Sequence, residues 1–267
     1  MAAPDLERYP LTGRFLMGRL RHAMSPAEED LIESLIEETE TFPRPTRLLE
    51  RGQLVDRSTI LIEGYVLRTI RHGDRRFIVG IHVPGDFMDL HAFALKRLDH
   101  DIVTVGETRV GYVRHDRLAA AVAANAHIAR LLWFATLLDA AIHRQWIVTL
   151  EQLTAVRRVA HIFCALWQRL DQVGLGRRDG LRTPLIQADL ADMCGTTAIH
   201  MNRALRQLKK EGLAEFRRGT VYVPDRAKLE TFAGFDPAYL YGEGPLHPEH
   251  ELDAPGLQDT SAASDSP

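Results

Sequence analysis

Apolar and polar positions recur with different periods along the chain, and the period changes at a few points. Near the N-terminus Ser25 precedes Pro26, and Glu28 lies three residues after Ser25, which is the pattern of a helix N-cap with a capping box. We therefore expect a helix over 25–40. From 42 to 114 short β-rich runs alternate with turn sequences, a spacing typical of an antiparallel barrel or jelly roll.

The pattern becomes helical again from 116 to 170, where Gly and Pro are almost absent. Its apolar residues occupy more than one face, as expected when a helix packs on its own domain and on a second subunit. A central helix in a monomer is the alternative. The apolar series comprises Leu131, Phe134, Leu138, Ala141, Ile142, Val148 and Leu153.

A Gly- and Pro-containing stretch at 171–184 predicts a connection into a separate small domain. The next forty residues divide into a short helix, a turn at Gly195, a longer helix and two short strands, and this order is that of a winged helix-turn-helix. The helices are expected over 187–193 and 197–211, and the strands on either side of 217–219.

Composition sets limits on the class of protein. The 267 residues leave room for two domains, 45% of them are hydrophobic, and the formal net charge is −3. No uncharged run reaches the roughly 18 residues of a membrane span, and two cysteines are too few for a disulfide scaffold. We therefore expect a cytoplasmic protein without a membrane partner. The last 25 residues contain six acidic residues and no Lys or Arg, which predicts a disordered tail.

A helical wheel separates the residues of the second helix in the predicted helix-turn-helix. Ala198, Met201, Leu205 and Leu208 gather on one side and are expected in the core. The opposite side should face solvent or a ligand, and it carries Thr196, Ile199, His200, Arg203, Gln207 and Lys210. Between 198 and 223 there are six Lys or Arg residues against two acids, an excess of four positive charges. A surface that faces phosphate needs such an excess.

Three motifs resemble those of the Crp/Fnr family of bacterial transcription regulators. They are "EGYVLR" at 63–68, "VPGDF" at 83–87 and "ADLADMCGTTAIHMNRALRQLKKEGL" at 188–213, and the resemblance covers roughly 25–232. It implies an α+β fold with a cupin-like antiparallel β jelly-roll sensor domain, a long dimerisation helix and a C-terminal winged helix-turn-helix. The expected divisions are an N-terminal arm at 1–24, the sensor domain at 25–130, the dimerisation helix at 131–156, the winged domain at 157–242 and a disordered acidic tail at 243–267.

The resemblance also assigns roles on double-stranded DNA, with a homodimer on a palindromic operator and RNA polymerase as a further partner. Arg203 matches the family's Arg that contacts guanine, a contact that suits the guanidinium fork. Arg-Glu precedes that Arg in many members, whereas Ala198 and Ile199 stand here. The segment instead resembles a branch with Thr-x-x-His-x-Asn-Arg. The candidate contacts are Thr196, Thr197, Ile199, His200, Asn202, Arg203, Gln207, Arg217 and Arg218.

Each candidate suits one type of contact with DNA. Thr196 or Thr197 can cap the helix and touch phosphate, and Ile199 can meet a thymine methyl group. Arg217 and Arg218 suit phosphate, although a solvated charged turn is an equal alternative for either one.

No cofactor is expected from the sequence. At the positions where the family binds cyclic AMP through Glu and Arg-Ser, this chain has Leu90, His100 and Asp101, which offer no phosphate cradle. Iron–sulfur members use cysteines near the N-terminus, and the first cysteine here is Cys164. A small-molecule effector, a haem or no effector all stay open. The histidines of the sensor region lack metal-cupin spacing and are expected to be surface or hydrogen-bonded residues, so no metal site is expected. They are His72, His82, His91, His100 and His115.

Cys194 lies at the turn before the second helix. A helix N-terminus can lower the pKa of a thiol, and oxidation there would add bulk and charge beside phosphate, so a redox switch is one hypothesis. A buried, inert thiol is the alternative. Two rival functions also stay open: a cupin-like metal- or haem-dependent sensor or enzyme, and a sensor that binds a protein instead of DNA. We find no clustered ligands or paired catalytic groups in the sequence and expect no enzyme.

Overall fold

The structure is a computed structural model that describes residues 6–242. The segment 6–24 contains turns and the short 3-10 helix η1 (Arg21–Ala23). The side chains of Tyr9, Phe15 and Leu20 are buried, so this part of the expected N-terminal arm packs into the core. The expected disordered tail at 243–267 lies outside the described residues.

An antiparallel sheet follows, in the strand order β1-β5-β3-β4, with β2 also paired to β5. The two long strands β3 and β5 form its centre and bend at register shifts near Glu63. This confirms the antiparallel β domain expected from 42 to 114. The strands are β1 (Glu38–Phe42), β2 (Arg47–Leu49), β3 (Arg57–His72), β4 (Arg75–His82) and β5 (Asp101–Arg114).

Helix α2 (Pro26–Ser34) begins as predicted but ends earlier than the expected 25–40. Ser25 Oγ accepts a hydrogen bond from the Glu28 amide, and the Glu28 carboxylate accepts one from the Ser25 amide at 2.9 Å. The prediction was wrong after Ser34, because Glu38–Phe42 pairs with β5 along its whole length. Backbone hydrogen bonds to a long neighbouring strand outweigh the weak helical preference of this Glu- and Thr-rich segment.

The helical region expected from 116 to 170 consists of three helices. Asn125 ends the first of them and caps the second, because its Oδ1 accepts hydrogen bonds from the amides of His127 and Ile128. The second break, at 153–154, lies inside the expected dimerisation helix at 131–156. The helices are α4 (His115–Ala124), α5 (Ala126–Gln152) and α6 (Ala155–Gln172), and the short α3 (Ala92–Leu95) precedes β5.

The C-terminal part has the expected order of helix, turn, helix and hairpin. A three-stranded antiparallel sheet in the order β6-β8-β7 lies beside its helices. The elements are β6 (Gly180–Arg182), α7 (Gln187–Met193), α8 (Ala198–Lys210), β7 (Glu215–Arg217), β8 (Thr220–Tyr222), α9 (Arg226–Ala233) and η2 (Pro237–Leu240). The mixed helix and antiparallel-sheet class predicted from the sequence is therefore confirmed.

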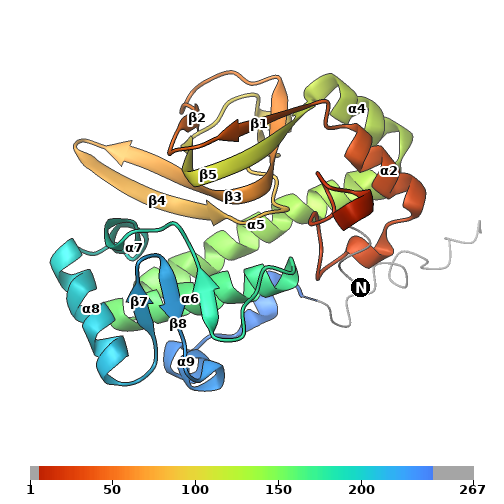
Figure 1. Cartoon of the computed structure of the whole chain (residues 1–267). Helices are drawn as coiled ribbons and strands as arrows, with labels where there is room; N and C mark the ends of the chain where they lie inside the picture. The colour runs from red at the N-terminus through yellow and green to blue at the C-terminus, as the bar shows by residue number, and fades with distance from the viewer. Residues whose placement is uncertain (1–5, 243–267) are drawn as a thin grey trace, which may run out of the picture.

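The larger sheet and the C-terminal part share one hydrophobic core. Leu67 of β3 and Ile78 of β4 belong to the same buried cluster as Phe163 of α6 and Met201 of α8. Figure 1 shows α5 running below the sheet, with α8 at the outer edge of the C-terminal part. Among the helices of residues 6–242, none is long and apolar enough to cross a membrane.

Candidate nucleic-acid interface

The first helix of the helix-turn-helix, α7, begins without a side-chain cap. The side chain of Ile186, at the N-cap position, has no acceptor atom, but the Asp189 carboxylate accepts a hydrogen bond from the Ile186 amide at 3.0 Å. Half of a capping box is therefore present, although Ile186 stands where a Ser, Thr or Asp cap is usual. After α7 the chain turns at Gly195, whose φ of +60° lies in the left-handed region that favours glycine.

The second helix, α8, begins at its predicted cap. Thr197 Oγ1 accepts a hydrogen bond from the His200 amide at 3.3 Å, and the same hydroxyl lies 2.8 Å from His200 Nδ1. This double contact orients the imidazole at the start of the helix. Thr196, the other candidate cap, is half-buried and does not cap α8.

One face of α8 is buried and the opposite face is open. Met201, Ala204 and Leu208 are buried in the shared core. The helical wheel placed Ala198 in the core, but its side chain is exposed. Ala198 is the first residue of α8, so no preceding helical turn holds it against the rest of the protein. On the open face Ile199 leaves 68% of its surface exposed. The other exposed side chains there are those of His200, Arg203, Gln207 and Lys210.

Asn202 occupies a different place from the other candidates. It is half-buried, and its Nδ2 donates to Gln187 Oε1 of α7 at 3.4 Å. The Nε2 of Gln187 also donates to the carbonyl oxygen of Ala198 at 3.1 Å, so Gln187 links the two helices. Sequence reasoning missed Gln187, although a polar residue at the first position of α7 was a usable signal.

The hairpin between β7 and β8 presents two more candidates. Arg217 pairs with Thr220, and the turn between them consists of Arg218 at φ +48° and Gly219 at φ +74°. Two consecutive positive φ values are those of the tight turn that matches the twist of a hairpin. Both arginine side chains are exposed at this tip.

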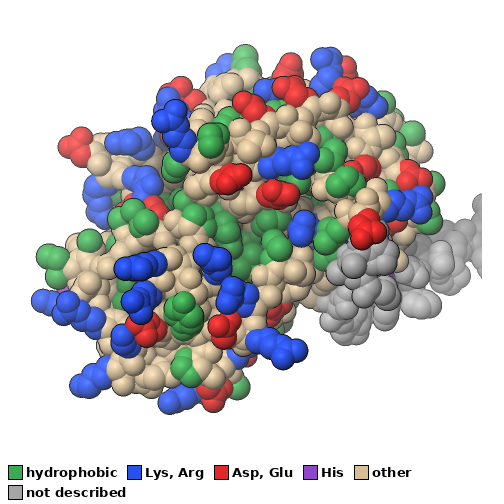
Figure 2. Space-filling view, viewed as in Figure 1, with side chains coloured by type: hydrophobic (Ala, Val, Ile, Leu, Met, Phe, Trp, Pro, Cys, Tyr) green, Lys and Arg blue, Asp and Glu red, His purple; other side chains and the backbone are tan. Residues whose placement is uncertain are grey.

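Positive charge gathers on α8 and the hairpin. Lys209 Nζ forms an ion pair with Glu215 at 2.6 Å, and Gln207 Nε2 donates to Glu211 at 2.9 Å. The remaining cations form no ion pair with another described residue: Arg203, Arg206, Lys210, Arg217 and Arg218. Figure 2 shows Lys and Arg side chains spread over the surface that α8 and the hairpin occupy in Figure 1. Such a surface attracts a polyanion.

Sequence comparison matches the C-terminal part of the chain to a known domain. Residues 157–232 match the family model described as the Crp-like helix-turn-helix domain. They form a Crp-like helix-turn-helix domain. The remaining part of the chain is not covered by that match, and no curated protein matches the sequence.

Solved structures with the same fold cover both parts of the chain. FixK2 from Bradyrhizobium japonicum is 22% identical, with a TM-score of 0.67 over 73% of this chain and 96% of that one. A transcriptional regulator of the CRP family from Thermus thermophilus is 19% identical, with a TM-score of 0.60 over 73% and 97%. The c-di-GMP-responsive global regulator CLP from Xanthomonas campestris is 15% identical, with a TM-score of 0.61 over 74% and 99%. At these identities the similarity establishes the fold.

Inside the Crp-like domain, Cys194 is fully buried at the end of α7. Burial raises the pKa of its thiol to about 12, which favours the alternative of a buried, inert thiol over the redox hypothesis. The turn around it is held from two sides. Trp146 Nε1 donates to the carbonyl oxygen of Met193, and Arg158 Nη1 donates to that of Cys194.

The positions that the family resemblance matches to cyclic-nucleotide contacts, Leu90, His100 and Asp101, lie outside residues 157–232. His100 Nδ1 lies 2.7 Å from the Asp99 carboxylate, and Asp101 Oδ1 accepts a hydrogen bond from the Arg51 amide at 2.7 Å. Leu90 packs against a hydrophobic cluster. His100 and Asp101 therefore each have one polar partner within the protein, and none of the three side chains offers a cation to a phosphate.

Three potential metal ligands meet beside this place, which sequence spacing did not predict. One ligand atom each of His91, Asp99 and His100 lies within 4.8 Å of the others. The pKa values of both histidines are lowered to about 4, first by burial and then by the positive charge of Arg68. That charge opposes a cation, and the Asp99 side chain is 83% exposed. The cluster has suitable donor types, but its electrostatic surroundings are unfavourable for a metal ion.

Proposed function

We propose that the chain is a transcription regulator of the Crp/Fnr type that binds a palindromic DNA operator as a homodimer. The observation that carries this proposal is the open face of α8. His200 and Arg203 project from it, and the exposed arginines of the β7–β8 hairpin flank it. A helix of this kind fits the major groove, where Arg203 donates to guanine O6 and N7. Arg217 and Arg218 neutralise phosphate and contribute affinity without sequence preference.

The surface of α5 supports a dimer. Trp133, Leu137, Ile147 and Val148 are all more than half exposed, and they recur at helical spacing along this 27-residue helix. A second copy related by a two-fold axis covers such a stripe. The same axis places two α8 helices about 34 Å apart, one turn of the double helix.

We further propose that cyclic AMP is not the effector. The partners of His100 and Asp101 support this, since both side chains are already engaged within the protein. Contact with RNA polymerase would complete the regulator's function, as the family resemblance implies.

Selection of bound fragments from random DNA tests the proposal. We expect a two-fold symmetric consensus, and binding that weakens about a thousandfold or more between about 50 and 200 mM salt. Replacing both Arg217 and Arg218 by Ala should reduce the salt dependence and leave the consensus unchanged, whereas Arg44→Ala, on the far exposed surface of the sheet domain, should alter neither. Recovery of no consensus from the purified chain would contradict the proposal.

A further inference from the structure

A small pocket, about 40 Å³ in volume and partly open to solvent, lies where three parts of the molecule meet. Arg14 and Arg19 come from the N-terminal segment, Asp86 from the loop after β4, and Arg169 from α6 in the Crp-like domain. None of the three positions that match the cyclic-nucleotide contacts of the family lines this pocket. It is therefore separate from that place.

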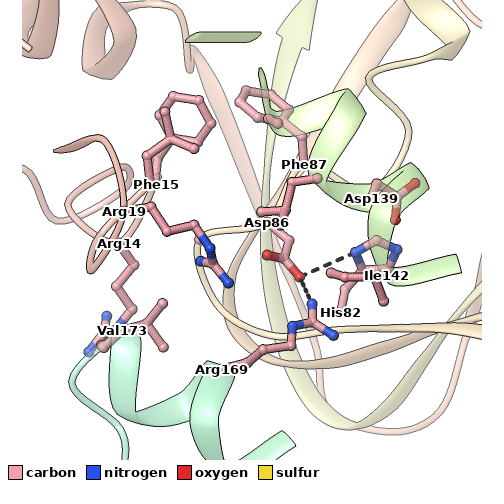
Figure 3. A pocket seen from close by; sticks show the side chains of 14 residues that line it. Arg14, Phe15, Arg19, His82, Asp86, Phe87, Asp139, Ile142, Arg169 and Val173 are labelled. Carbon is pink, nitrogen blue, oxygen red and sulfur yellow. Dashed lines mark hydrogen bonds and ion pairs between the residues drawn. The ribbon is translucent and has the colours of Figure 1, made fainter. Parts of the chain in front are cut away.

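The charges that line the pocket do not balance. The Asp86 carboxylate forms an ion pair with Arg169, and Asp139 forms one with Arg68, which lies outside the lining. Arg14 and Arg19 form no ion pair with another described residue. Figure 3 shows the Arg19 guanidinium pointing toward the Asp86 carboxylate.

Arg19 is the least satisfied of these cations. Its side chain is 95% buried, at 5% relative exposure. Its Nε donates to the carbonyl oxygen of Leu240 at 2.9 Å, but its Nη2 has no hydrogen-bond partner within the described chain. Burial lowers the pKa of this guanidinium to about 10, which still leaves it charged at neutral pH. The charge of Asp86, which is paired with Arg169, is shared with Arg19, and a buried charge without a full counter-ion of its own is costly.

Arg169 adds a second donor to the same space. Its Nη1 donates to the carbonyl oxygen of Ile81 and its Nη2 to Asp86, while its Nε is buried without a partner. His82 also lines the pocket and stands 3.4 Å from Asp86, and burial lowers its pKa to about 4, so it adds no charge at neutral pH. The pocket is lined by three arginines and by one carboxylate, Asp86, that has no ion-pair partner outside the lining. The lining therefore carries a net charge of two positive.

We propose that this pocket binds a small dianion, held by the guanidinium groups of Arg14, Arg19 and Arg169. A phosphate group or a pair of carboxylates matches the planar donor fork of arginine and restores the charge balance.

The place of the pocket gives a bound dianion a structural effect. It would join the N-terminal segment, the β4 loop and α6, and so fix the sensor part on the Crp-like domain. An influence on DNA binding follows only if the proposed function holds. The binding itself does not depend on that function.

Calorimetry and thermal unfolding of the full chain at pH 7.5 test the site, with sodium phosphate or sodium succinate as the probe and sodium chloride at equal ionic strength as the reference. We expect saturable heat and a concentration-dependent rise in the unfolding midpoint with at least one dianion. Binding should weaken at least tenfold in Arg19→Met and in Arg14→Met, and should persist in Arg44→Met, a matched change at an exposed arginine outside the pocket.

The variants separate this proposal from a purely structural role of Arg19. Because Arg19→Met removes a buried charge, its midpoint without probe should equal or exceed that of the wild type. A response to phosphate alone assigns a phosphate ester, and a response to both probes assigns the shared dianion chemistry. Equal responses to phosphate, succinate and chloride would overturn the site, as would an unaltered response in Arg14→Met and Arg19→Met. No DNA is present, so that failure would leave the proposed function untouched.

Discussion

Arg76 of strand β4 donates a hydrogen bond from Nη2 to Oδ1 of Asp189 in α7, at 2.6 Å. Its Nε donates to Asp192 on the same helix at 2.9 Å. Because Asp189 also accepts from the Ile186 amide, this one arginine holds the start of the helix-turn-helix against the larger sheet. The Arg76 side chain is 36% exposed, so solvent screens the pair.

Arg76→Gln should loosen α7 more than it destabilises the whole chain. We expect a loss of about 1 kcal/mol or less in the free energy of unfolding, because a partly exposed ion pair contributes little. Amide hydrogen exchange should become faster within Gln187–Met193. Arg71→Gln is the control, since Arg71 faces Arg76 across the β3–β4 hairpin and is exposed. Unchanged protection of α7 in Arg76→Gln would show that the contact does not restrain the helix.

Both cysteines should be unreactive in the folded protein. Cys164 and Cys194 are buried, and burial raises the pKa of each thiol to about 12. We expect no labelling by a maleimide under native conditions and two labels per chain after denaturation. Peroxide treatment should leave DNA affinity unchanged. Rapid native labelling that is lost in Cys194→Ser would restore the redox hypothesis.

A charge in the α5 stripe should prevent dimerisation. Leu137 is 51% exposed, and in the proposed dimer it is covered by the second copy. Leu137→Asp should therefore shift the chain from dimer to monomer in sedimentation, because a carboxylate cannot be buried there without a partner. Leu95→Asp, at an exposed leucine of α3, should leave the dimer intact. A wild-type chain that sediments as a monomer would contradict the dimer.

Acid should destabilise the fold through its buried histidines, at pH values above the range in which most carboxylates titrate. Burial lowers the pKa of His82, His91, His100 and His161 to about 4 each, from an ordinary value of 6.5. The unfolded chain therefore binds more protons between these values, and stability is lost as the pH falls from about 6.5 toward 4, by up to about 1.4 kcal/mol per pH unit per histidine. Burial raises the pKa of Asp89 to about 6, which offsets one of the four.

Urea unfolding at pH 7 and pH 5 measures this difference. His72→Gln, at an exposed position, should leave the pH dependence as it is, whereas His161→Gln should reduce it. A urea midpoint that is the same at both pH values would contradict the lowered pKa values of the buried histidines.

Local sequence signals predicted α7, α8 and the cap at Thr197, because helix starts and turns depend on residues close in sequence. These signals failed where contacts between distant segments determine the secondary structure. The helix expected to 40 ends at Ser34 because β5 pairs with the following segment. The dimerisation helix expected over 131–156 starts earlier, at the Asn125 cap, and ends at Gln152, and the apolar pattern shows neither boundary.

Part of the candidate site could be predicted from the sequence in the same way. The exposed face of α8 followed from helical periodicity, while the inward position of Asn202 depends on Gln187 of another helix. The proposed dianion pocket could not be predicted from the sequence, because two of its lining residues, Arg19 and Arg169, are 150 residues apart in the chain. In the sequence both arginines look like ordinary surface residues.

The ratio of affinities for the selected operator and for scrambled DNA, compared between wild type and Arg203→Ala, tests most directly whether α8 reads base sequence. We predict that this ratio falls roughly 5- to 150-fold, since a good bidentate contact to guanine is worth about 1–3 kcal/mol of discrimination. Arg206→Ala removes the same charge from the same helix and should weaken both affinities while preserving the ratio. Full selectivity in Arg203→Ala would contradict the assignment of this face as the sequence-reading surface.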